Sequence, residues 1–105
     1  MSVPPLSPQQ RARALELAAA ARLRRAELRE RLKVGATGVA QVLEDAETDD
    51  ALARMRVVTL LESLPGVGPA TASRIMDELG IAASRRLRGL GRHQRTALQE
   101  RFPRA

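Results

Sequence analysis

The 105-residue chain contains no cysteine and a single histidine, His93. Without cysteine it can form no disulfide, thiol nucleophile or thiolate zinc site. One imidazole is also too few for the metal sites that histidines usually build. We therefore expect no cofactor and no bound metal, and we expect His93 to lie at the surface.

Long apolar runs are missing as well. No stretch approaches the roughly 20 residues that span a bilayer, and the first residues lack the basic and then apolar pattern of a signal peptide. We expect a cytoplasmic protein without membrane contacts. A chain of this length supports one modest hydrophobic core, so residues 1–105 are predicted to form a single domain.

Aromatic residues are nearly absent, since Phe102 is the only one. Proteins that bind single-stranded nucleic acid generally stack its bases on aromatic side chains. The net charge is +6, and arginine supplies 17 of the 18 basic residues. Arginine binds phosphate and guanine in a bidentate geometry that lysine cannot match. This composition favours double-stranded DNA as the partner, with no small-molecule substrate.

The charge is unevenly distributed along the chain. Residues 1–33 carry a net charge of +5, residues 34–53 carry −5, residues 54–78 are neutral and residues 79–105 carry +6. A polyanion would therefore meet mainly the C-terminal quarter, helped by the first helix. The five acids between residues 44 and 50 fit helix capping and solubility better than a metal site.

No stretch alternates apolar and polar residues with a period of two, so we predict an all-α fold. A long N-terminal helix over 7–33 should pack on a compact bundle of short helices over 38–105, after an extended tail over 1–6. Ser7, Pro8 and Gln10 match a capping box with proline at the first helical position.

The predicted long helix has two distinct faces. One is an apolar stripe, which we expect to face the core: Ala14, Leu17, Ala21, Leu28 and Leu32. The other face is basic and is either a solvated surface or an auxiliary phosphate-contacting edge. Its residues are Arg11, Arg22, Arg29 and Lys33.

Three helix signals follow before the central motif. Thr37 is predicted to cap a helix over about 38–47 whose apolar residues Val39, Val42 and Leu43 face inward. Thr48 is predicted to cap the next helix, with acids in its first turn. Apolar residues then recur at every third position over 52–64, which predicts a helix continuing into the motif.

The central motif over 64–76 reads LPGVGPATASRIM. Gly66 and Gly68 leave no side chain between the backbone amides and a ligand, while Val67 should turn inward as an anchor. Pro69 fits the first turn of a following helix, whose positive end would present free N–H groups to a phosphate. The motif resembles the helix-hairpin-helix family, which binds duplex backbones without reading bases.

A second glycine-bounded turn follows over 84–91, which reads SRRLRGLG. Ser84 is predicted to cap a short helix, with Leu87 and Leu90 as apolar anchors. The three arginines of this turn should point outward beside the first glycine loop. Gly91 should begin the last helix, with Arg92 in its first turn as a further auxiliary contact. The two turns together predict a helix-two-turn-helix over about 56–102.

Taken end to end, the chain resembles the actinobacterial integration host factor family. The resemblance rests on residues 4–11 (PPLSPQQR), residues 60–68 (LLESLPGVG) and residues 84–91. It implies an all-helical nucleoid-associated protein that binds duplex DNA with little sequence preference. It further implies that the protein bends and compacts DNA and supports site-specific integration. Pro69 stands where the family usually has lysine, so this chain should depend more on its arginines.

The resemblance also assigns DNA-contacting positions to this chain. The glycine loop should position phosphates through its amides, and the arginines of the second turn should supply most of the positive charge. The predicted DNA-binding residues are Arg56, Pro65, Gly66, Val67, Gly68, Pro69, Ala70, Thr71, Arg74, Arg85, Arg86, Arg88, Gly89 and Gly91.

Other functional classes are less favoured by the sequence. DNA glycosylases also use helix-hairpin-helix motifs, but their reacting carboxylate or lysine has no counterpart here, because the only lysine, Lys33, stands without a partner. We predict a non-enzymatic, monomeric DNA-binding domain. The alternatives are a ribosomal or structured-RNA module that uses the same two-turn element, and a protein-interaction adaptor that docks through its first helix.

Overall fold

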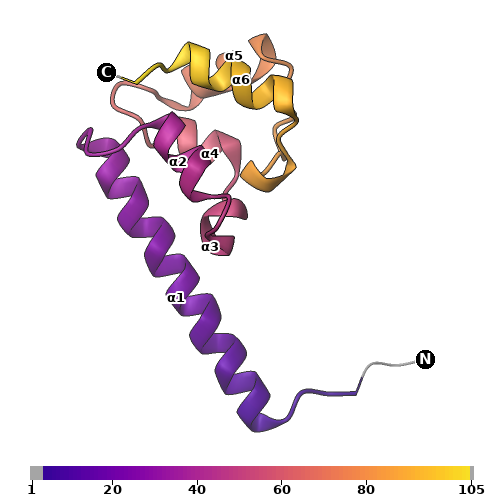
Figure 1. The fold of residues 1–105 in the computed structure, drawn as a ribbon. Helices are drawn as coiled ribbons and strands as arrows, with labels where there is room; N and C mark the ends of the chain where they lie inside the picture. The colour runs from indigo at the N-terminus through magenta and orange to yellow at the C-terminus, as the bar shows by residue number, and fades with distance from the viewer. Residues whose placement is uncertain (1–3, 105) are drawn as a thin grey trace.

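The computed structural model describes residues 4–104, and within them every regular element is a helix (Figure 1). One isolated bridge pairs Arg56 with Arg86. The all-α prediction is confirmed. No helix in this part of the chain has the length and apolar character needed to cross a membrane. The elements are α1 (Pro8–Lys33), α2 (Val39–Asp45), α3 (Asp50–Ala53), α4 (Val57–Glu62), α5 (Pro69–Glu78), the 3-10 helix η1 (Leu87–Gly89) and α6 (Arg92–Arg101).

Helix α1 begins at the predicted capping box. The Ser7 hydroxyl accepts from the Gln10 amide at 3.1 Å, and the Gln10 Oε1 accepts from the Ser7 amide at 2.9 Å. Proline stands at its first helical position, where the missing N–H costs nothing. The predicted extended tail lies partly outside the described residues, and residues 4–7 have no regular structure.

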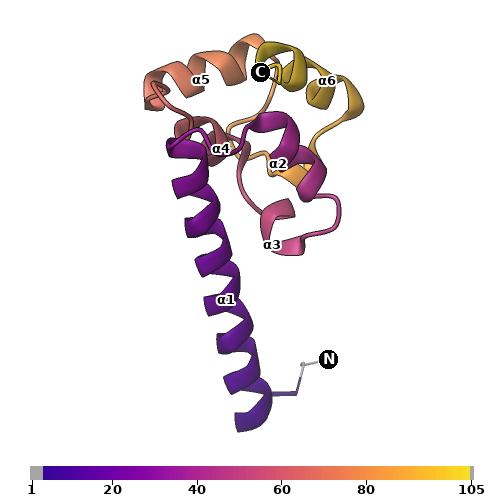
Figure 2. The same ribbon diagram turned by 60° about the vertical axis from the view of Figure 1, so that its left-hand side comes forward.

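The apolar stripe predicted for α1 is only half correct. Leu28 and Leu32 are buried in the core, but every residue over 8–20 is exposed and Leu17 retains 59% of its accessible surface. Figures 1 and 2 show the reason: the short helices gather around the C-terminal part of α1, and its N-terminal part projects beyond them. High helix propensity, rather than packing, accounts for helix formation there.

The hydrophobic core lies where the C-terminal end of α1 meets the short helices. Its completely buried leucines come from four elements: Leu32 from α1, Leu43 from α2, Leu60 and Leu61 from α4, and Leu98 from α6. Helix α5 contributes Ala72, Ile75 and Met76. This core holds the two glycine turns in place at the surface.

Two predicted helix caps are wrong by one residue. Gly38, and not Thr37, is the N-cap of α2, and the Thr37 hydroxyl is buried without a hydrogen-bond partner in the described structure. Asp49, and not Thr48, caps α3, because its carboxylate accepts from the amides of Ala51 and Leu52. The predicted inward residues of α2 are buried.

The continuous helix predicted over 52–64 is also wrong, because the chain breaks between α3 and α4. At the break, the Val57 amide donates to the Arg85 carbonyl at 2.9 Å and the Leu87 amide donates to the Met55 carbonyl at 2.9 Å. These long-range hydrogen bonds replace helical ones. The apolar repeat persists through the break, since Met55 remains buried, so periodicity alone could not reveal it.

We predict that two leucines of α1 differ sharply in their effect on stability. Leu32→Ala empties a completely buried site and should lower the free energy of unfolding by about 2–5 kcal/mol. Leu17→Ala, on the exposed half of the same helix, should change it by less than about 0.5 kcal/mol. Urea unfolding followed by circular dichroism measures both values. Equal losses would show that the N-terminal half packs on the body.

Candidate nucleic-acid interface

The glycine loop between α4 and α5 has the geometry of an anion site. Gly68 is the N-cap of α5, without a side-chain cap, and Pro69 occupies the first helical position. Within residues 4–104 the amides of Ala70 and Thr71 have no hydrogen-bond partner. They lie at the positive end of the helix dipole, so the loop offers donors to a phosphate.

The two glycines of this loop differ in whether the backbone conformation itself favours glycine. Gly66 has a φ of +73°, a left-handed conformation that favours glycine. Gly68 has a φ of −88° and a ψ of 179°, which any residue adopts, and a Cβ built there would meet nothing within 4 Å. Neither backbone strain nor packing within the described protein requires glycine at position 68. A partner that approaches the backbone closely would require it.

The predicted anchor of the loop is partly confirmed by its packing. Val67 is half-buried against the core, and its amide donates to the Leu64 carbonyl at 3.2 Å. Pro65, Gly66 and Pro69 are exposed around it. Val67 therefore anchors the loop to the core, while the exposed residues around it remain accessible to a partner.

The second turn differs from its prediction in local structure. Its residues form η1, whose N-cap is Arg86 without any side-chain cap, so the predicted cap at Ser84 is wrong. The turn is fixed instead by the backbone hydrogen bonds to Met55 and Val57 and by the burial of Leu87. As predicted, Leu90 packs against the core and α6 begins after Gly91.

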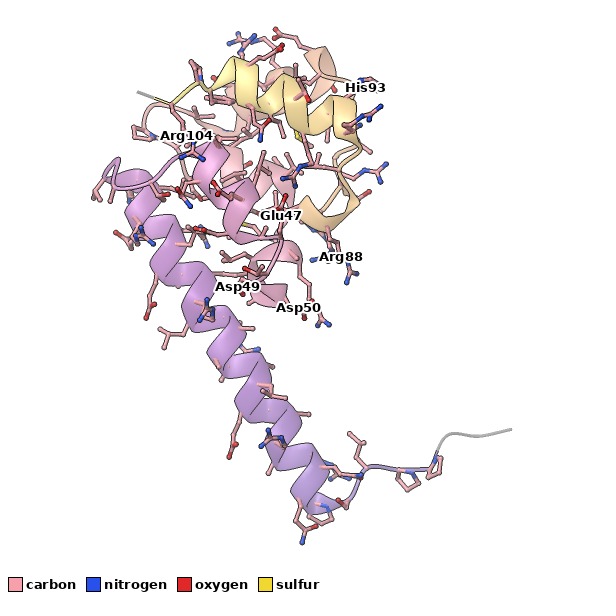
Figure 3. The ribbon with its side chains drawn as sticks, viewed as in Figure 1. Glu47, Asp49, Asp50, Arg88, His93 and Arg104 are labelled. Atoms are coloured by element: carbon pink, nitrogen blue, oxygen red, sulfur yellow. The ribbon has the colours of Figure 1, made fainter. Side chains whose placement is uncertain are left out.

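The three arginines of this turn are held to different degrees. Arg85 Nη1 donates to the Gly89 carbonyl at 3.1 Å, and a Cβ at Gly89 would lie only 3.1 Å from Arg85 Cδ. Arg86 Nη1 donates to the Arg54 carbonyl at 2.6 Å. A guanidinium carries five N–H donors, so both side chains are oriented while retaining donors for phosphate. Arg88 is exposed and points outward (Figure 3).

Arg56 and Arg86 stand directly opposite each other in the antiparallel bridge. Like charges at opposed positions repel, and no carboxylate of the described residues forms an ion pair with either side chain. This uncompensated pair of charges favours an anionic partner. It also shows that Arg56 belongs with the second turn and not with the glycine loop.

The two turns are separated by the length of one short helix. They stand at opposite ends of α4, whose six residues span about 9 Å. Two hollows lie along one side of α1, and each hollow is lined by residues of α1 and by residues at or near one of the two turns. The first, about 800 Å³, joins Arg22 and Arg25 of α1 to Arg54, Arg56 and Arg86. The second, about 460 Å³, joins Arg29 and Lys33 to residues 62–66 at the glycine loop.

Three of the predicted auxiliary cations therefore lie next to the two turns, namely Arg22, Arg29 and Lys33. Arg11 lies far along the projecting half of α1, where it donates to the Leu6 carbonyl. Arg92 is exposed at the start of α6. The sequence analysis missed Arg25 and Arg54. A signal for Arg25 was present, because it stands three residues after Arg22 on the same helical face.

Other arginines are committed to ion pairs within the protein. Arg95 pairs with Glu47 at 2.9 Å and Arg104 pairs with Glu44 at 2.7 Å, which connects the C-terminal segment to α2. Glu78 lies near two arginines, the predicted contact Arg74 at 3.8 Å and Arg101 at 3.2 Å. Four acids of the cluster, Glu44, Glu47, Asp49 and Asp50, thus pair with arginines, a role the sequence did not reveal, whereas Asp45 accepts from Gln41. They include no grouping in the described residues suited to a metal.

Comparison with known proteins gives a consistent result. Residues 32–102 match the family described as the S13-like H2TH domain. An integration host factor of Mycolicibacterium smegmatis is 60% identical over 102 residues, with 97% of each chain covered. Integration host factors of Mycobacterium tuberculosis and Streptomyces coelicolor are 59% and 50% identical over the same length, covering 97% of this chain and 97% and 95% of theirs.

One solved structure extends the comparison to three dimensions. It is described as sIHF bound to an 8-base-pair palindromic DNA and matches with a TM-score of 0.81 at 47% identity. The match covers 83% of this chain and 98% of that one.

The geometry of the glycine loop predicts unequal effects of alanine at its two glycines. Gly66→Ala places a Cβ in the left-handed region and should cost about 1–2 kcal/mol of unfolding free energy. Gly68→Ala meets no atom and restricts the unfolded chain, but it replaces a favoured N-cap residue with a poor one, so the two effects oppose each other and the net change should stay below about 0.5 kcal/mol. Thermal and urea unfolding of both variants give the comparison. Equal destabilisation would contradict the loop geometry described above.

Proposed function

Since the chain belongs to the actinobacterial integration host factor family, within the S13-like H2TH proteins, we propose that it is a non-enzymatic architectural protein that binds double-stranded DNA. Residues 1–105 act as one DNA-binding domain and bind as a monomer. The protein works in the cytoplasm, on the nucleoid, where it bends and compacts DNA and supports site-specific integration.

The observation that carries this proposal is the placement of phosphate-binding chemistry along one side of α1. The glycine loop offers unpartnered amides, and the bridge at the other end of α4 offers the guanidinium groups of Arg56 and Arg86. The intervening side of α1 adds further cations in the two hollows. The hollow at the second turn is strongly basic, with five arginines against Asp50, whereas the hollow at the glycine loop balances Arg29 and Lys33 with Glu30 and Glu62. Two separated phosphate-binding sites suit a regularly spaced polyanion better than a single small anion.

The same surface explains why binding should be tolerant of sequence. Backbone amides and arginines directed at phosphates position a duplex but do not read its bases. The near absence of aromatic residues leaves no platform for unstacked bases. Selectivity would then come from the shape and deformability of the duplex, which is how a protein that bends DNA distinguishes sites.

The first prediction of this proposal concerns salt. Each phosphate neutralised by a cation releases counterions, so affinity should fall by about a thousandfold or more between about 50 and 200 mM salt. Unrelated duplexes should show similar affinities at each salt concentration. Fluorescence anisotropy with two duplexes of different sequence, competed by a structured RNA, measures this. A salt-insensitive complex, a strong preference for one short site, or preferential RNA binding would contradict the proposal.

The second prediction separates the proposed contacts from general charge. Gly68→Val should weaken duplex binding at least tenfold, because a Cβ at this position meets no protein atom and the added side chain would obstruct a phosphate at the loop amides. Arg88→Ala should also weaken binding, since it removes an outward cation. Replacing both Arg85 and Arg86 with alanine should weaken it further.

The matched control is Arg31→Ala, which removes the same charge from α1 on the side facing Asp45 and Asp49. Its affinity for the duplex should stay within about twofold of the wild type, because Arg31 lies away from the proposed surface and salt screens exposed charges beyond about 8–10 Å. Equal losses in Arg31→Ala and Arg88→Ala would show that charge alone, and not the proposed surface, governs binding. Circular dichroism confirms folding in each variant.

A further inference from the structure

The direction of α1 relative to the body depends on contacts in its C-terminal half, where it packs on α3 and enters the core. Its buried residues are Leu28 and Leu32, near its C-terminal end, and all residues over 8–20 are exposed. One ion pair adds a contact nearer to the projecting half, between Arg24 of α1 and Asp49 at the start of α3. Asp49 lies between the two helices in Figure 3. This pair stands where the supported and unsupported parts of α1 meet.

Asp49 uses its two carboxylate oxygens for different purposes. Oδ1 accepts from the amides of Ala51 at 3.1 Å and Leu52 at 3.4 Å, which fixes the side chain at the start of α3. Oδ2 accepts from Arg24 Nη2. The Asp49 side chain is only 16% exposed. Because the Asp49 side chain is held at the N-terminus of α3, its ion pair with Arg24 holds α1 in a defined position relative to α3.

The neighbouring acid shows the contrast. Asp50 pairs with Arg54 at 3.1 Å, four residues later, and its side chain is 76% exposed. That pair lies within one short helix and its C-cap, so it does not connect α3 to α1. Asp49 and Asp50 therefore differ in what they join, although they are adjacent and carry the same charge.

We propose that Asp49 is a positioning residue that sets the direction of α1 and, through it, the path of bound DNA. The second part rests on the proposed function. From Arg24 to its first residue, α1 extends about 24 Å, so a tilt of about 10° moves its tip by about 4 Å. The basic hollow has Arg22 and Arg25 of α1 on one wall and Arg54, Arg56 and Arg86, with Asp50, on the other, while Arg24 and Asp49 line a separate hollow between α1 and α3. Its width follows the direction of α1.

The position of α1 can be tested without DNA. Because the chain has no cysteine, Leu15→Cys on α1 and Gln99→Cys on α6 accept two spin labels at exposed sites. Asp49→Asn keeps a good N-cap but removes the charge that binds Arg24. We expect the label distance to shift or broaden by several ångströms in Asp49→Asn. An unchanged distribution in this variant overturns the proposal.

The controls separate positioning from charge and from folding. Asp50→Asn makes the same charge change at the adjacent residue, which does not pair with α1, and should leave the label distance unchanged. Arg24→Gln should reproduce the effect of Asp49→Asn, and Arg24→Lys, which keeps the charge, should restore most of the wild-type distance. A shift of equal size in Asp50→Asn would assign the effect to net charge and overturn the proposal. Circular dichroism monitors folding.

The consequence for DNA has its own measurement. A duplex of about 30 base pairs with a fluorophore at each end reports its end-to-end distance when saturated with protein. Asp49→Asn should change the transfer efficiency, and Asp45→Asn, which makes the same charge change outside the basic hollow, should match the wild type. A changed label distance with unchanged transfer refutes the link to DNA path. Failure of the wild type to bind the duplex refutes the proposed function, while the label distances still decide the role of Asp49.

Discussion

Two backbone hydrogen bonds, between Val57 and Arg85 and between Leu87 and Met55, determine where the cations of the interface stand. They interrupt the helix between α3 and α4, hold η1 against that break and bring Arg56 opposite Arg86. The buried side chains of Met55, Val57 and Leu87 stabilise this junction from within the core. The second turn contains only the three-residue 3-10 helix η1, so its geometry follows from the pairing.

Several local features were predictable from the sequence, whereas the caps at Thr37, Thr48 and Ser84 and the break between α3 and α4 were not. The capping box at Ser7, the glycine loop and the start of α5 at Pro69 each follow from a few adjacent residues. The break after Ala53 depends on a segment thirty residues away, and the apolar repeat conceals it. Family resemblance supplied the two-turn architecture, but the structure alone brings Arg25 and Arg54 into one hollow with Arg22.

Some arginines form ion pairs that stabilise the fold, and others remain available to bind an anionic partner. Glu44, Glu47 and Asp49 pair with arginines from the C-terminal segment and from α1, and they thereby fix the elements around the core. The cations near the two turns have few carboxylate partners of this kind. A net charge of +6 therefore understates the contrast between the two surfaces, because much of the compensation occurs away from the proposed interface.

The projecting half of α1 behaves thermodynamically as a peptide attached to a folded anchor. Without tertiary packing over 8–20, its helix is maintained by propagation from the packed turns and by the cap at Ser7, so it obeys helix–coil statistics. The hydrogen-bonded turns at the N-terminal end of this helix fray and re-form within about a microsecond, far faster than the body unfolds. Helix content in this segment then declines gradually on heating, below the cooperative transition of the core, and an anion that neutralises its arginines shifts that balance.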